Sequence, residues 1–86
     1  MAQSEFTSAQ AGAVAEALGL SFTDLSFDLE QFCLGMNVEL EHGSRDPETD
    51  VTGDTPVLTG KIALAHLKEM PDYYTRLAAM EAEAEA

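Results

Sequence analysis

The chain has 86 residues, of which 16 are acidic and 4 are basic, so its formal net charge is −12. This charge opposes binding to nucleic acid phosphates and to anionic lipid headgroups, and we therefore exclude both as partners. It permits cations and proteins with a basic surface. The length allows one domain, which we expect to span residues 1–86 and to have a small core.

Cys33 is the single cysteine, so the chain cannot form an internal disulfide. We expect this thiol to fill a small, buried apolar position; the alternative, a reactive or metal-binding thiol, would need an electropositive or metal-bearing neighbourhood. The N-terminus lacks a basic stretch followed by an apolar run, and no segment approaches the length of a membrane span. These features predict a soluble cytoplasmic protein.

The first predicted helix covers residues 5–19. Thr7 or Ser8 can serve as its N-cap, and Gly19 is a natural C-terminal stop. Its apolar stripe is expected to consist of Phe6, Ala13, Ala17 and Leu20. Residues 21–27 then form a connection.

The second predicted helix covers residues 28–42, opened by Ser26 or Asp28 and stopped by Gly43. Its expected core stripe consists of Leu29, Phe32, Cys33, Met36 and Leu40. Gly35 stands inside this helix, where glycine costs up to about 1 kcal/mol relative to alanine. It therefore indicates either close approach of another backbone or room for a ligand.

An acidic loop is predicted at residues 43–55. Its alternating acids resemble a calcium loop, but Val51 stands where an EF-hand needs glycine and Val57 where it needs glutamate. We therefore interpret this segment as a solvated loop.

The third predicted helix covers residues 56–70, between the Thr55-Pro56 start signal and Pro71. It has two apolar stripes, one of Leu58, Ile62 and Ala65, and one of Ala63, Leu64 and Leu67. At about 100° per residue, His66 and Glu69 point with the first stripe, which predicts that they face packed surface.

A last helix is predicted at residues 72–83, with a frayed acidic tail at 81–86. All strongly patterned segments have helical period and cap signals. The sequence therefore predicts an all-α fold, a small compact bundle of about four helices.

Two pairs of metal-ligand residues stand at mirrored spacing, Glu39 with His42 and His66 with Glu69. Residues three apart share one helix face, so two packed helices could bring both imidazoles and both carboxylates together, within one chain or across a dimer interface. This donor set suits iron, manganese or zinc. The alternative is structural: His42 interacts with the end of its helix, and His66 hydrogen-bonds Glu69 or a core tyrosine.

A conventional enzyme is not supported, because no nucleophile and base stand at readable spacing and no glycine-rich cofactor loop is present. Two function classes remain. One is a small protein that binds a divalent metal through its paired Glu and His residues, and the other is a non-enzymatic interaction or structural module with an acidic surface. A marginal core and a helix with two apolar sides also predict a homodimer.

Three segments carry a family resemblance: residues 37–43 (NVELEHG), 59–66 (TGKIALAH) and 71–77 (PDYYTRL). They resemble a family of short, uncharacterised microbial and phage proteins that carries only a domain-of-unknown-function label. The resemblance covers about residues 5–81. It implies a self-contained small domain and brings no established activity.

Overall fold

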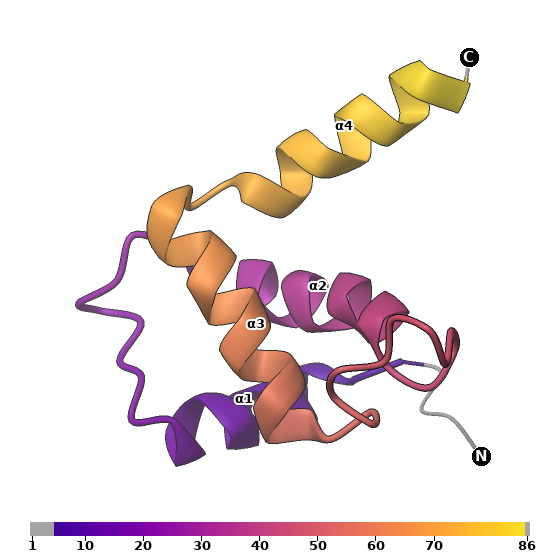
Figure 1. The fold of residues 1–86 in the computed structure, drawn as a ribbon. Helices are drawn as coiled ribbons and strands as arrows, with labels where there is room; N and C mark the ends of the chain where they lie inside the picture. Colours follow the sequence, from indigo (N-terminus) through magenta and orange to yellow (C-terminus); the bar gives the residue numbers. More distant parts are fainter. Residues whose placement is uncertain (1–4, 86) are drawn as a thin grey trace.

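The computed structural model describes residues 5–85, which form four α-helices and one short 3₁₀ helix (Figure 1). The α-helices are α1 (Ser8–Ala17), α2 (Leu29–Glu39), α3 (Pro56–Glu69) and α4 (Tyr73–Glu85), and the 3₁₀ helix η1 (Leu40–His42) follows α2 directly. Residues 5–85 contain no strand. The predicted all-α class is confirmed.

Local capping explains where the helices begin. Thr7 and Gln10 form a capping box at the start of α1, in which each side chain accepts a hydrogen bond from the other residue's backbone N–H. The Asp28 carboxylate accepts from the Gln31 N–H at the start of α2, at 2.9 Å. Pro56 occupies the first turn of α3, where its missing N–H costs no hydrogen bond.

The core lies where α1, α2 and α3 meet. Phe32, Met36 and Leu40 are fully buried, so the predicted stripe of the second helix is inward, although Leu29 and Cys33 are only partly buried. The backbone tightens into η1 after Glu39, which ends the α-helix three residues earlier than expected.

The predicted inner face of the first helix was wrong in part. Ala13 and Ala17 are exposed, and the face that packs inward consists of Ala11, Val14 and Ala15. This phase buries the larger, branched Val14 along with two alanines, which removes more apolar area from water than burial of Ala13 and Ala17 would. Val14 meets α3 at Gly60, where an added Cβ would lie 2.5 Å from its Cγ1 atom.

The two stripes of α3 also differ from expectation. Ala63 and Leu67, from the second stripe, are fully buried together with Thr59. Leu58 is 43% exposed, and Ala65 is exposed as well, so much of the first stripe faces solvent. The helix is therefore packed mainly on one side.

Helix α4 docks by its first turn and then projects away from the other helices (Figure 1). Tyr74 is its buried residue, Tyr73 and Leu77 are partly buried, and residues 78–85 are all exposed. The acidic tail was expected to fray from residue 81, but in the structure the helix continues to Glu85; Ala86 lies outside the described residues.

Gly35 makes the docking of α4 possible. A Cβ built on Gly35 would collide with the Tyr74 ring, including its Cδ2 atom at 2.8 Å. Of the two explanations drawn from the sequence, close approach is therefore nearer to what is observed, but the approaching group is an aromatic side chain and not a backbone.

Candidate functional site

A buried carboxylate stands at the end of α2. Glu39 is 3% exposed, and its Oε2 atom accepts a hydrogen bond of 2.6 Å from the Tyr74 hydroxyl of α4. A hydrogen bond to a charged acceptor is about twice as strong as a neutral one, and an unpaired buried carboxylate would be costly. This buried contact therefore helps to tie α4 to the core.

Two histidines approach the same carboxylate from different elements. The Nε2 atom of His42, in η1, lies 3.5 Å from Oε1 of Glu39. The Nε2 atom of His66, in α3, lies 3.6 Å from Oε2. Both imidazoles are half-exposed, with 49% and 37% of their side-chain surfaces accessible. When protonated, each can form an ion pair with Glu39.

Aromatic packing fixes the orientation of His66. Its ring stacks on the ring of Tyr73 with centroids 4.4 Å apart and planes 4° apart. Tyr73 in turn meets Tyr74 edge to face at 4.9 Å. The consecutive tyrosines of α4 thus make different contacts. Tyr73 stacks on His66, and Tyr74 donates a hydrogen bond to Glu39.

Tyr74 remains a hydrogen-bond donor because its environment opposes ionisation. Burial is the main cause that raises the pKa of Tyr74, and the hydrogen bond to Glu39 raises it further. The Glu39 carboxylate thereby keeps a neutral O–H donor throughout the physiological range. We call Glu39, His42, His66 and Tyr74 the polar cluster.

A second feature lies on α4 next to the polar cluster. A groove of about 330 Å³ runs along the helix and is lined by Met70, Tyr73, Arg76, Leu77 and Met80. Met70 is 41% exposed and Met80 58% exposed. On α4 the apolar positions continue at a spacing of four, three and four through Tyr73, Leu77, Met80 and Ala84. This spacing is that of a short coiled-coil seam.

The chain matches one known protein family. The model of a family described as "Protein of unknown function (DUF5661)" matches residues 11–83. The chain belongs to this family. A search of curated proteins and a search of solved structures each found no match. The family match confirms the resemblance to an uncharacterised group and assigns no activity. Among residues 5–85, no helix is long and apolar enough to cross a membrane.

The structure brings together three of the four predicted metal ligands. Glu39, His42 and His66 meet, whereas Glu69 is exposed at the end of α3. Residues three apart differ by about 60° around a helix, so His66 can face α2 while Glu69 faces solvent. In the part of the chain that the structure describes, no group of three or more His, Cys, Asp or Glu residues is arranged to hold a metal ion. The structural alternative expected His66 to hydrogen-bond Glu69 or a core tyrosine; in the structure its ring stacks on Tyr73, and its Nε2 atom lies 3.6 Å from Glu39.

Sequence reasoning missed the importance of Tyr74. Tyr74 was not singled out from the sequence, yet its hydroxyl is the donor that satisfies Glu39. Two features were available: a buried tyrosine usually finds a partner for its hydroxyl, and Gly35 and Glu39 stand four residues apart on one face of α2. Together they indicate an aromatic ring over the glycine and its polar end at the glutamate.

Cys33 is a structural thiol. It donates through Sγ to the Phe6 carbonyl at 3.6 Å, and Asn37 holds the same backbone by donating to the Phe6 carbonyl and accepting from its N–H. Burial is the main cause that raises the pKa of the Cys33 thiol, and the nearby Glu5 carboxylate adds to it. The thiolate needed for reactivity is therefore disfavoured.

Proposed function

We propose that this protein is a non-enzymatic interaction module that presents the apolar face of α4 to a helical segment of a basic partner. The observation that carries the proposal is the shape of α4, which is anchored through Tyr74 and then leaves residues 78–85 exposed. The polar cluster, on this account, is the anchor that sets the direction of the helix.

The apolar face of α4 is suited to helix pairing. Leu77, Met80 and the ring of Tyr73 lie on one side, and the groove beside them extends to Met70. Amphipathic partner helices bind such surfaces through anchors at matching spacing. Met80 adds adaptability, because the unbranched methionine side chain fits irregular surfaces.

The acidic residues at the end of α4 favour a partner with a basic surface. Glu81, Glu83 and Glu85 lie on the exposed end of α4, within a chain whose net charge is −12. Lysine or arginine beside the apolar anchors of a partner helix would meet these carboxylates and accelerate association. A second copy of this chain would also carry a net charge of −12, so the two copies would repel each other. We therefore favour a basic partner over the homodimer that the sequence suggested.

Two designed peptides test the proposal. Both are amphipathic helices with leucine anchors, one with lysine and the other with glutamate at the flanking positions. We expect the lysine peptide to bind and the glutamate peptide not to bind, and we expect binding to weaken as salt screens the charges. No detectable binding of the lysine peptide by calorimetry would contradict the proposal.

Paired variants localise the surface. Replacing Leu77 and Met80 with glutamine should weaken binding of the lysine peptide by about tenfold or more, because buried anchor residues contribute most of the binding free energy of an interface. Replacing Ala79 and Ala82 with glutamine changes the opposite face of α4 and should leave affinity within about twofold. Equal losses in both variants would contradict the assignment. Sedimentation that shows a stable dimer in both low and high salt would identify a second copy as the occupant instead.

Metal binding is a second candidate, favoured by the meeting of three predicted ligands at one buried carboxylate. Both Nε2 atoms lie within 3.6 Å of Glu39 oxygens. A first-row divalent metal would require the half-exposed imidazoles to turn toward a shared position beside the Tyr74 hydrogen bond. If so, zinc, manganese or ferrous iron should raise the melting temperature by mass action, and His66→Ala should abolish the gain. An unchanged melting temperature with all three metals would exclude this candidate.

A further inference from the structure

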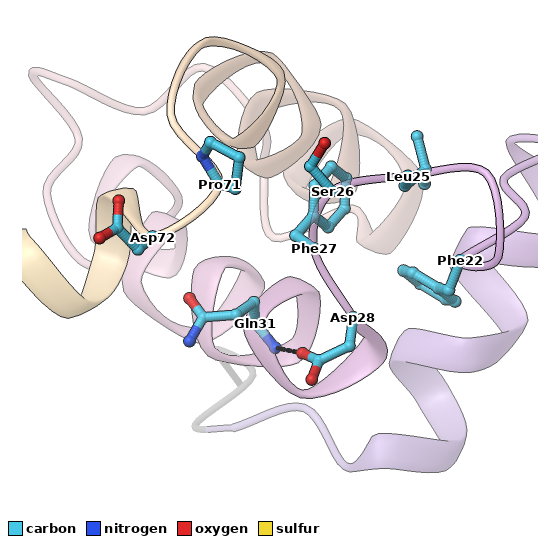
Figure 2. Close-up of a pocket in the computed structure, with 8 residues that line it drawn as sticks. All are labelled: Phe22, Leu25, Ser26, Phe27, Asp28, Gln31, Pro71 and Asp72. Carbon is cyan, nitrogen blue, oxygen red and sulfur yellow. Dashed lines mark hydrogen bonds between the residues drawn. The ribbon is translucent and has the colours of Figure 1, made fainter.

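A groove of about 440 Å³ separates the 22–28 connection from the start of α4 (Figure 2). Its apolar lining consists of Phe22, Leu25, Phe27 and Pro71, and its polar lining consists of Ser26, Asp28, Gln31 and Asp72. This volume falls within the range of about 300–1,000 Å³ that is common for small-ligand sites. The groove shares no lining residue with the polar cluster or with the apolar groove of α4.

Gln31 is the unusual residue in this groove. Its Nε2 atom donates to the Thr75 hydroxyl at 3.1 Å, but its Oε1 atom is buried and has no hydrogen-bond partner within the described residues. An unsatisfied buried acceptor is uncommon in folded proteins and is unfavourable. Gln31 lines the groove, so a turn of its side chain would offer this acceptor to a donor on a bound molecule.

The groups beside Gln31 are also acceptors. Figure 2 shows its side chain between the carboxylates of Asp28 and Asp72. Asp28 accepts the Gln31 N–H at 2.9 Å, and Asp72 accepts from Arg76 Nε at 2.9 Å. Arg76 offsets the charge of Asp72, so Asp28 supplies the negative charge that a ligand would meet. Acceptors with one unoffset carboxylate favour a cationic donor.

We propose that this groove binds a small primary amine that carries an aromatic ring. The ammonium group donates hydrogen bonds to Oε1 of Gln31 and to the Asp28 carboxylate. The ring lies on the apolar side against Phe22 and Phe27, whose own rings meet edge to face with centroids 6.1 Å apart. The contacts are independent of the helix-binding face of α4.

Three matched probes test the ligand class by nuclear magnetic resonance titration of the 15N-labelled chain: 2-phenylethylamine, neutral 2-phenylethanol and anionic 3-phenylpropionate. We expect the amine to bind with a dissociation constant of about 1 mM or tighter, shifting the Gln31 side-chain signals, and the other two to bind at least about tenfold more weakly. Equal binding of the amine and the alcohol would overturn the proposal, as would no binding of the amine. A lysine side-chain mimic, N-acetyl-lysine amide, should bind more weakly because it lacks the ring; equal binding would overturn the choice of an aromatic amine.

Variants separate the site from general charge effects. Asp28→Asn retains a good N-cap residue and should weaken binding of 2-phenylethylamine about fivefold or more. Glu30→Gln removes the same charge from an exposed position two residues away and should change affinity by less than about twofold. Gln31→Met removes the acceptor and should abolish binding; it also removes the Nε2 bond to the Thr75 hydroxyl, which is exposed, so the melting temperature should change little. Equal effects of the two charge variants, or unchanged affinity in Gln31→Met, would overturn the site.

Discussion

At the scale of single residues, the Glu39–Tyr74 hydrogen bond is the contact on which the position of α4 depends. Both groups are buried, with Tyr74 1% exposed and Glu39 3% exposed, and the bond is 2.6 Å long. The half-exposed histidines lie beside this bond without replacing it, because their nitrogens are 3.5 and 3.6 Å from the carboxylate oxygens. Removing the tyrosine hydroxyl therefore leaves the carboxylate without its close donor.

Tyr74→Phe should lower the free energy of unfolding by about 1–3 kcal/mol, the cost of an unsatisfied buried acceptor. Tyr73→Phe keeps the ring that stacks on His66 and should cost less than about 0.5 kcal/mol. Urea denaturation of the two variants measures both values. Equal stability of the two would show that the hydroxyl of Tyr74 has no special role.

Alkaline pH gives a second prediction for Tyr74. Burial and the bond to Glu39 raise the pKa of Tyr74 in the folded state, while an unfolded tyrosine ionises near pH 10. The contribution of Tyr74 to stability is therefore fully present below about pH 10 and is lost as the pH rises further. The stability advantage of the natural chain over Tyr74→Phe should shrink between about pH 10 and pH 12. A constant advantage over this range would contradict the shift.

At the scale of helices, α2 accepts α4 because Gly35 leaves space for an aromatic ring. An alanine side chain would contact the Tyr74 ring at distances that real Cβ atoms do not adopt. Gly12 of α1 is the natural comparison, since a Cβ added there meets no atom within 4 Å. Alanine substitution at Gly12 therefore changes only helix propensity, whereas alanine substitution at Gly35 changes both helix propensity and packing.

Gly35→Ala should destabilise the fold by about 1–3 kcal/mol, because overpacking outweighs the gain in helix propensity. Gly12→Ala should stabilise it by up to about 1 kcal/mol, because only the propensity changes. Thermal unfolding of both variants provides the comparison. If Gly35→Ala were as stabilising as Gly12→Ala, the close docking of α4 against α2 would be contradicted.

The helices of this fold could largely be predicted from sequence, whereas their packing could not. Cap residues such as Asp28 and stops such as Pro71 act locally, so the helix ranges are close to those observed. The inward face of α1 was misjudged because alanines surround Val14 and give little indication of phase. The partner of Glu39 could not be read from pair spacing, because Tyr74 is 35 residues away along the chain.

At the scale of the molecule, a small hydrophobic core of three helices supports one projecting helix. The core of α1, α2 and α3 supplies the packing, the polar cluster fixes α4, and α4 offers an apolar groove beside acidic residues. The proposed amine site at Gln31 is separate from this face and is tested by separate experiments. The central claim is therefore that α4 is the surface used for a basic partner helix.

Amide hydrogen exchange with and without the lysine-flanked peptide tests this claim most directly. Residues 78–85 are exposed, so their amides should exchange readily in the free protein. Peptide binding should slow exchange along α4 from Leu77 onward and leave α1 unchanged. Binding of the peptide with unchanged exchange in α4, or with protection confined to another element, would contradict the account.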